Sequence, residues 1–202
     1  MIAVIDYQLN NLKSLTSALS SLEIEFEVIS NPESLADFQS VILPGVGAFS
    51  AGMNKLVCKG WDRALIQSAQ NGAKIMGICL GMQLLFETSN EFEPTNGLKI
   101  LKGTVNAFIP KKFLPVPHMG WNDLRIRRPH QILNNIRDGV DMYFVHSYYV
   151  KPINSSIILA ETEYGNHFPS IVLNENILGV QFHPEKSYPA GMHLLKNFAN
   201  WI

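Results

Sequence analysis

The sequence predicts an α/β fold: a central, mostly parallel sheet flanked by helices, with additional antiparallel or mixed strands in the second half of the chain. In the first half, short apolar runs alternate with segments whose apolar residues recur at helical spacing. Parallel neighbouring strands need a crossover connection, so this alternation indicates a parallel sheet covered by helices. From about residue 98 onward, short β-rich runs follow one another instead, which indicates antiparallel or mixed pairing.

The elements of the first half follow from the residue pattern in order. Residues 2–6 form an unbroken apolar run that ends in an acid, as expected for a strand buried on both faces. Apolar residues then recur at helical spacing from Leu12 to Leu22, which predicts a helix with one apolar stripe. Further strands are expected at 26–29, 41–43 and 73–78, and further helices near 61–71 and over 82–87.

The second half is expected to contain several short strands and a closing helix. The strands are expected at 103–108, 141–146, 157–162, 168–173 and 177–183, and the helix at 191–201. The segment 110–130 is rich in proline and basic residues, so we expect an irregular, solvated loop there, with a partner surface as the alternative. All 202 residues are expected to form a single domain, residues 1–202.

Composition and charge exclude several classes of protein. Hydrophobic residues make up 47% and charged residues 16% of the chain, which excludes disorder. A net charge of −1 creates no field that attracts nucleic acid or an anionic membrane, so we expect neither as a partner. The first residues lack the features of a secretory signal, and the apolar run 75–86 is too short and too polar to span a bilayer. With only two cysteines, the cytoplasm is the expected compartment.

A candidate nucleophile lies in the segment Gly77-Ile-Cys79-Leu-Gly81, which follows a β-branched run and precedes a predicted helix. This is the strand-turn-helix context of a nucleophile elbow, with sulfur in place of the serine oxygen. The flanking glycines let strand and helix approach closely around a strained turn. The start of the helix favours the thiolate over the thiol. The alternative is a small buried residue with no chemistry, and the paired glycines favour the nucleophile over it.

A thiolate nucleophile needs an imidazole to move protons and a group that orients the imidazole. His183 and Glu185 are two residues apart, and at the end of a strand over 177–183 their side chains would point to one face. Glu185 would then fix the tautomer of His183. His130 and His193 are weak candidates, because neither has a neighbouring acid, and His118 and His146 are intermediate candidates, because each lies in a dense aromatic or polar cluster of the sequence.

The segment Pro44-Gly45-Val-Gly47 ends the third predicted strand and can turn backbone N–H groups outward, as an oxyanion site requires. Alone, this pattern is more typical of an ordinary strand-to-helix turn than of an oxyanion site. Cys79, however, ends the next predicted strand, and the carboxyl ends of parallel strands form the edge at which ligands bind. We therefore expect both loops to open on the same side of the sheet.

Together these motifs resemble the class I (triad) glutamine amidotransferases. The resemblance rests on Gly77-Ile-Cys79-Leu-Gly81-Met-Gln83, His183-Pro-Glu185 and Pro44-Gly45-Val-Gly47. Within that family, further motifs resemble the glutaminase subunits of imidazole glycerol phosphate synthases. These are His118-Met-Gly-Trp-Asn122, Tyr143-Phe-Val-His-Ser-Tyr148, Tyr164-Gly165 and Gln181-Phe-His-Pro-Glu-Lys-Ser187. The resemblance extends over nearly the whole chain.

The resemblance implies roles for individual residues. Cys79 is the implied nucleophile, His183 the acid and base, and Glu185 the group that orients His183. The implied oxyanion hole consists of the amides of Val46 and Leu80, with Gly45 and Gly47 in the same turn. The implied glutamine pocket is lined by Gln83, Glu91, His146, Ser147 and Tyr148. No metal or organic cofactor is needed.

The implied reaction is hydrolysis of L-glutamine to glutamate and ammonia, with the ammonia passed to a (βα)8-barrel cyclase subunit in a heterodimer of histidine biosynthesis. One stretch departs from the family pattern Asp-Tyr-Gly-Met-Gly-Asn-Leu and reads Asp6-Tyr7-Gln8-Leu9-Asn10-Asn11-Leu12. In the family this loop lies towards the synthase barrel. The departure is also compatible with a paralogue that supplies ammonia to a synthase aminating a nucleotide-linked surface sugar.

Two further alternatives belong to other classes. A non-catalytic scaffold of this fold would only bind a partner, and the intact Cys79, His183 and Glu185 argue against it. A cysteine hydrolase or peptidase of similar fold would act on another substrate, and the residues of the implied glutamine pocket argue against that.

Overall fold

The computed structural model describes residues 1–9, 11–110 and 114–201. Its main sheet has eight strands in the order β2-β1-β3-β4-β14-β13-β12-β9. From β2 to β14 all neighbours are parallel, and β13, β12 and β9 continue the sheet with antiparallel pairing. The strands span Phe26–Ile29 (β2), Ile2–Ile5 (β1), Ser40–Leu43 (β3), Lys74–Ile78 (β4), Ile177–Val180 (β14), His167–Asn174 (β13), Ile158–Glu163 (β12) and Arg125–Ile126 (β9). The predicted fold class is confirmed.

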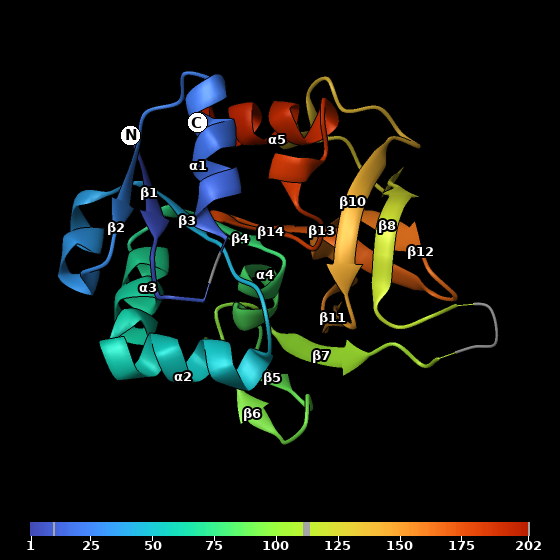
Figure 1. Cartoon of the computed structure of the whole chain (residues 1–202), viewed down its shortest axis with the longest axis horizontal. Coiled ribbons are helices and arrows are strands. Elements are labelled where there is room, and N and C mark those ends of the chain that lie inside the picture. Colours follow the sequence, from blue (N-terminus) through green and yellow to red (C-terminus); the bar gives the residue numbers. More distant parts are fainter. Residues whose placement is uncertain (10, 111–113, 202) are drawn as a thin grey trace.

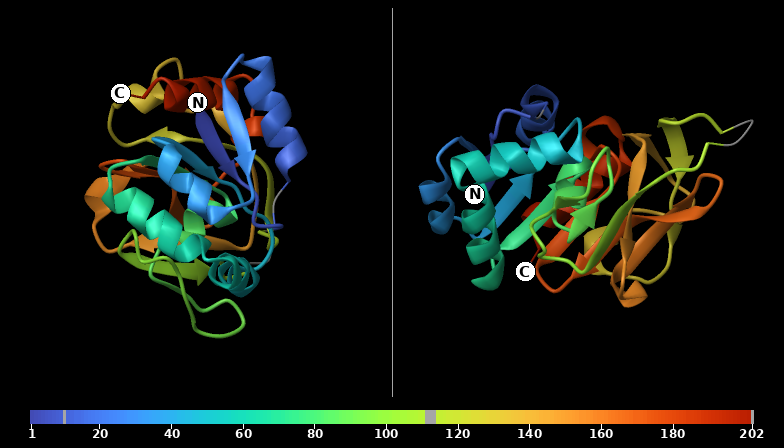
Figure 2. Two further views of the ribbon diagram at one scale, coloured as in Figure 1. Left: turned by 90° about the vertical axis from the view of Figure 1, so that its left-hand side faces the viewer. Right: turned by 90° about the horizontal axis from the view of Figure 1, so that it is seen from below.

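Helices cover both faces of the main sheet, because the side chains of each buried strand alternate between two cores. Ile2 and Val4 of β1 pack with helices α1 and α5 on one face. Ala3 and Ile5 pack with α2 and α3 on the other face. Figures 1 and 2 show these two helical layers, with α1 and α5 on one side of the sheet and α2 and α3 on the opposite side. The helices span Leu12–Ser21 (α1), Phe49–Lys59 (α2), Trp61–Gln70 (α3), Leu80–Leu84 (α4) and Ala190–Ala199 (α5).

Two smaller sheets flank the antiparallel end of the main sheet (Figure 1). One pairs β8 with β10, and the other has the order β11-β7-β5-β6. Their strands are His118–Asp123 (β8), Asp141–His146 (β10), Tyr148–Pro152 (β11), Gly103–Ala107 (β7), Thr88–Ser89 (β5) and Thr95–Asn96 (β6). Short 3₁₀ helices lie at Pro32–Asp37 (η1), Gln131–Leu133 (η2), Ser155–Ile157 (η3) and Pro184–Lys186 (η4).

The segment 110–130 is not the wholly irregular loop that the sequence analysis expected. It contains β8, which pairs with β10 over its full length, and β9, which extends the main sheet. Only one residue of β8, His118, is buried, so the strand depends on backbone pairing and lacks an apolar alternation that could reveal it. Part of this loop prediction, residues 111–113, lies outside the described residues.

The strand expected at 177–183 is shorter than predicted and ends at Val180. Gln181 continues the main-chain pairing with β13, since its N–H donates to the Ser170 carbonyl. His183 follows in extended backbone and precedes η4, where Pro184 begins a helical turn. The turn carries Glu185 back towards His183.

The two ends of the chain lie near each other in Figure 1, away from the carboxyl ends of the parallel strands. The Lys74 ammonium, at the amino end of β4, donates a hydrogen bond to the Trp201 carbonyl. Among the described helices, none is long and apolar enough to cross a membrane.

Candidate active site

Cys79 occupies a strained turn between β4 and α4. Its φ of 53° and ψ of −110° lie in a region that residues other than glycine rarely adopt. The turn is held on both sides, because the Cys79 N–H donates to the Val180 carbonyl at 2.8 Å and the Cys79 carbonyl accepts the Gln83 N–H at 3.3 Å. The turn at Cys79 therefore has the backbone geometry of a nucleophile elbow, as predicted.

The two glycines around Cys79 are required by close backbone approach. A Cβ on Gly77 would lie 2.7 Å from the backbone of Gly81, and a Cβ on Gly81 would lie 1.9 Å from the Leu43 carbonyl oxygen. No side chain fits at either position without moving the strand or the helix. This is the packing that the spacing of the motif suggested.

His183 and Glu185 form a buried pair. Nδ1 of His183 lies 2.9 Å from Oε1 of Glu185, and the side chains are only 6% and 5% exposed. The backbone of His183 is fixed as well, since its N–H donates to the Tyr143 carbonyl of β10 and its carbonyl accepts the Ser187 hydroxyl. The predicted pairing is present in the structure, although a turn and not a strand provides it.

The electrostatic surroundings of His183 favour the imidazolium. Burial disfavours the charged ring, but interactions with Cys79 and Glu185 outweigh burial and raise the pKa of His183 to about 10. Nε2 of His183 is buried and has no hydrogen-bonding partner of good geometry among the described residues. Nε2 is thus left for exchange of a proton with the sulfur or with a bound substrate.

A cavity of about 280 Å³ opens over Cys79. It is lined by Val46, Gly47, Cys79, Leu80, Gln83, Glu91, Pro117, Val145, His146, Ser147 and Tyr148. Every residue expected in the glutamine pocket lies on this wall. Glu91 is held there by the Phe49 N–H at the start of α2, which donates to its Oε2 at 2.6 Å.

The two expected oxyanion amides are already engaged in this structure. The Val46 N–H donates to the Leu9 carbonyl at 3.1 Å, and the Leu80 N–H donates to the Gly45 carbonyl at 3.3 Å. Gly45 is not part of the cavity wall, whereas Gly47 is. The turn at 44–47 therefore lies beside Cys79, as expected, but the Val46 amide of this turn and the Leu80 amide of α4 are both engaged in other hydrogen bonds.

The sequence analysis did not identify two residues next to the nucleophile. Gln181 is fully buried, and its Nε2 donates to the Cys79 sulfur at 3.8 Å. Tyr7 is also fully buried, and burial, followed by the charge of Cys79, raises its pKa. A Cβ on Gly45 would lie 2.4 Å from the Tyr7 hydroxyl and 3.0 Å from the Gly81 nitrogen, so position 45 has little room for a side chain. The sequence feature that could have identified Gln181 is its position two residues before His183.

Comparisons with known proteins identify the family of the chain. The family model described as glutamine amidotransferase class-I matches residues 3–201. A relative from Desulfitobacterium hafniense, named imidazole glycerol phosphate synthase subunit HisH, is 44% identical over 202 residues, which is 100% of this chain and 95% of the relative. A relative of the same name from Moorella thermoacetica is 44% identical over 201 residues, with the same coverage of 100% and 95%.

Solved structures share the fold. A crystal structure of a glutamine amidotransferase superposes with a TM-score of 0.76 at 18% identity and covers 99% of this chain and 98% of that one. The structure of PurLQS from Thermotoga maritima gives a TM-score of 0.76 at 21% identity, with coverage of 99% and 97%. The match of the family model over nearly the whole length, together with relatives at 44% identity, shows that the chain belongs to the class-I glutamine amidotransferase family.

Proposed function

We propose that the chain is the glutaminase subunit of an imidazole glycerol phosphate synthase and hydrolyses L-glutamine to glutamate and ammonia. The observation that carries the proposal is the placement of Cys79, on a strained turn at the floor of a cavity, beside the buried pair of His183 and Glu185. The names of the relatives at 44% identity support the choice of synthase.

In the first half of the reaction, the Cys79 thiolate attacks the side-chain amide carbon of glutamine. The C=O π electrons move to oxygen, and two backbone N–H groups hold the resulting oxyanion. His183, charged through its interactions with Cys79 and Glu185, gives its Nε2 proton to the departing nitrogen as the C–N bond breaks. Ammonia leaves, and a γ-glutamyl thioester remains on Cys79.

In the second half, His183 is neutral and takes a proton from a water molecule that attacks the thioester carbon. The C–S bond breaks, the sulfur leaves as a thiolate, and glutamate is released. Glu185 keeps Nδ1 of His183 protonated in both halves, so that Nε2 alone exchanges protons with the reactants. No step requires a metal or an organic cofactor.

The cavity wall provides complementary groups for the rest of the substrate. Glu91 presents a carboxylate that can pair with the α-ammonium group of glutamine. Backbone groups of Ser147, between β10 and β11, and of Tyr148, the first residue of β11, can bind the amide and the α-carboxylate. Gln83 is fixed by a hydrogen bond from its Nε2 to the Tyr148 carbonyl at 3.0 Å, and it shapes the floor beside Cys79.

Under this proposal, the hydrogen bonds that the Val46 and Leu80 amides make in this structure keep the oxyanion hole from forming. The oxyanion hole forms only when the Val46 amide leaves the Leu9 carbonyl and the Gly45 carbonyl leaves the Leu80 amide. A partner that binds the second arrangement more tightly shifts the equilibrium towards it. We propose a (βα)8-barrel cyclase as that partner, in a cytoplasmic heterodimer that receives the ammonia.

Complementation tests the proposal. In a bacterial strain that lacks its own glutaminase subunit, this chain is expressed together with its cognate cyclase, and growth without histidine is expected. Cys79→Ser should abolish growth, because the alkoxide needed for attack is far less accessible than a thiolate. Cys58→Ser, at the exposed second cysteine, is the matched control and should grow.

A glutamine-like electrophile, diazo-oxo-norleucine, should modify Cys79 and leave Cys58 free. Modification of Cys58 with loss of activity would contradict the assignment of the nucleophile. Failure to grow without histidine, with amination restored to a surface-sugar synthase, would favour the paralogue; failure of both with a folded chain would favour a scaffold.

A further inference from the structure

The Cys79 sulfur has a hydrogen-bond donor that the reaction above does not use. Nε2 of Gln181 lies 3.8 Å from Sγ and donates to it, and the Gln181 side chain is completely buried. Gln181 follows β14, the strand paired with β4, so the same two strands that deliver His183 and Cys79 also deliver this amide. A buried amide N–H directed at the sulfur stabilises a thiolate more than a thiol, because hydrogen bonds to charged acceptors are the stronger ones.

The orientation of the Gln181 amide is fixed by Gln83. Nε2 of Gln83 donates to Oε1 of Gln181 at 3.1 Å and to the Tyr148 carbonyl at 3.0 Å, which uses both of its hydrogens. Because Oε1 of Gln181 accepts from Gln83, its Nε2 must face the sulfur. The donor to the nucleophile therefore depends on a carbonyl at the start of β11.

The Tyr148 carbonyl is also the end point of a second row of donors, which begins on β8. Nδ1 of His146 donates to this carbonyl at 2.8 Å, so Nε2 of His146 is an acceptor. Nδ1 of His118, 3.0 Å away, donates to it. Nε2 of His118 then accepts from Nδ2 of Asn122 at 3.2 Å.

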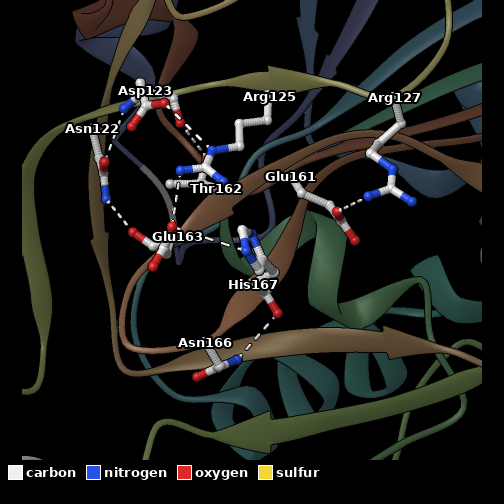
Figure 3. Close-up of polar contacts among 9 residues, drawn as sticks. All are labelled: Asn122, Asp123, Arg125, Arg127, Glu161, Thr162, Glu163, Asn166 and His167. Atoms are coloured by element: carbon white, nitrogen blue, oxygen red, sulfur yellow. Dashed lines mark hydrogen bonds and ion pairs between the residues drawn. The ribbon is translucent and has the colours of Figure 1, made fainter.

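Asn122 is held at its far side by β12, since its Nδ2 also donates to the Glu163 carbonyl at 3.0 Å (Figure 3). Each imidazole carries one proton in this arrangement. Burial lowers the pKa of His118 to about 4 and that of His146 to about 3, in agreement with neutral rings. The His118 ring is further fixed by stacking on Tyr164, with ring centres 4.0 Å apart, and on Phe144 at 4.9 Å.

These hydrogen bonds cannot conduct a proton, because both rows of donors converge on one backbone carbonyl and three of the side chains, Gln181, Gln83 and Asn122, are amides. They can only fix positions. We propose that Gln181 positions and stabilises the Cys79 thiolate, and that the chain Gln83, Tyr148 carbonyl, His146, His118 and Asn122 keeps that amide aligned from strand β8. The chemical role of the thiolate rests on the proposed function, whereas the geometry of these hydrogen bonds does not depend on it.

Other charged or titratable groups also act on Cys79 and must remain unchanged in a test. His183 and Glu185 act from the turn at η4, and Tyr7 acts from the end of β1. Glu91 and His146 share the cavity wall with the sulfur. None of these groups is altered in the variants below.

The first experiment measures the rate of alkylation by iodoacetamide against pH in a Cys58→Ser background, where Cys79 is the remaining thiol of the sequence. Gln181→Met removes the donor and keeps the volume, and Gln181→Glu replaces it with an acceptor. We expect the pH of half-maximal alkylation to rise in both, with the rate at neutral pH reduced about tenfold in Gln181→Met and further in Gln181→Glu. An unchanged pH profile in a folded Gln181→Met variant would overturn the proposal.

The second experiment changes His118, which contacts neither the sulfur nor the cavity. His118→Phe keeps the stacked ring and removes both hydrogen bonds, whereas His118→Asn keeps an amide donor near the position of Nδ1 and removes the stacking. We expect the alkylation profile of His118→Phe to shift in the direction of Gln181→Met and that of His118→Asn to return towards the parent. The reverse order, with a shifted profile only in His118→Asn, would show that His118 acts through packing and would overturn the proposed series of hydrogen bonds.

Arg127→Gln serves as the matched control, because it removes an exposed ion pair with Glu161 in the same region but outside the chain (Figure 3). Its profile should equal the parent. Thiol reactivity does not require glutaminase activity, so the two proposals fail separately. Shifted profiles without glutamine hydrolysis would leave this inference standing and remove the proposed function, and glutamine hydrolysis with unshifted profiles would do the opposite.

Discussion

Cys79 and His183 each have one local property that lowers the stability of the folded chain. The backbone of Cys79 lies in the positive-φ region, which costs about 1–3 kcal/mol for a residue with a side chain. Its neighbour His183 is charged while buried, which is unfavourable unless a partner compensates it. Cys79 and Glu185 both compensate this charge, and Oε2 of Glu185 has no hydrogen-bonding partner among the described residues. The residues of the site thus retain a conformation that stability alone would not select.

The raised pKa of His183 makes stability depend on pH in a defined direction. The pKa is about 10 in the folded chain, compared with about 6.5 for an unperturbed histidine. The folded state therefore binds more protons between these values, and the stabilisation is complete below about 6.5 and is lost as the pH rises through about 10. We expect the free energy of unfolding to fall over this window.

Glu185→Gln tests the cause. Without the carboxylate, the pKa of His183 should fall, so both the loss of stability and the alkaline loss of glutaminase activity should move to lower pH. Urea unfolding and initial rates, each measured over a pH series, check this. Identical alkaline limits in the parent and in Glu185→Gln would contradict the charge pairing.

At the scale of elements, the site is a junction of strand ends. Cys79 follows β4, the turn at 44–47 follows β3, and Gln181 and His183 follow β14, all at the carboxyl edge of neighbouring parallel strands. The edge brings together groups far apart in sequence without any long loop. Close contact of β3 with the start of α4 is the most demanding feature of this junction, since Gly81 lies directly against the Leu43 carbonyl.

Gly81→Ala should therefore damage the junction through steric overlap. Its Cβ would lie 1.9 Å from the Leu43 oxygen, so we expect a loss of at least about 2 kcal/mol in the free energy of unfolding together with loss of glutaminase activity. Gly72→Ala is the comparison, because a Cβ there meets nothing within 4 Å and only the positive φ of 85° is unfavourable. It should cost about 1 kcal/mol and leave activity intact. Equal losses in the two variants would contradict the steric explanation.

The same elements show what a sequence can and cannot predict. Strand β1 was predicted because it is a continuous apolar run, and α1 was predicted because it carries one apolar stripe. Helix α2 was not predicted, since Gly52 within it weakens the helical pattern; the structure explains the glycine by close packing on Leu80 and Leu84. β8 was not predicted because its partner is a distant strand, β10, and no local pattern records that pairing.

At the scale of the whole molecule, the loop that departs from the family pattern becomes part of the site. Leu9 accepts the Val46 amide, and Gln8 holds a φ of 67° where the family pattern has glycine. The family resemblance implied that this loop lies towards a partner, but nothing in the sequence indicated that the Leu9 carbonyl accepts the amide proposed as an oxyanion donor. Backbone hydrogen bonds of this kind depend on the conformation of two distant loops and leave no trace in residue identity.

The isolated chain is therefore expected to be a poor glutaminase. Addition of the synthase subunit and its substrate should raise the turnover number, because the arrangement with free Val46 and Leu80 amides becomes populated. Steady-state rates with and without the partner check this. A high rate for the isolated chain that does not change when the synthase subunit is added would contradict control by these amides.

The hydrogen bond between Lys74 and the Trp201 carbonyl has a practical consequence for such measurements. Lys74 begins β4 and Cys79 follows its last residue, so the carboxyl-terminal region lies about 16 Å, one strand length, from the nucleophile. Immobilisation of the protein through its carboxyl end is therefore expected to keep Cys79 away from the surface. Direct fusion of a synthase subunit at that end, by contrast, requires a linker long enough to cross the sheet to its opposite edge.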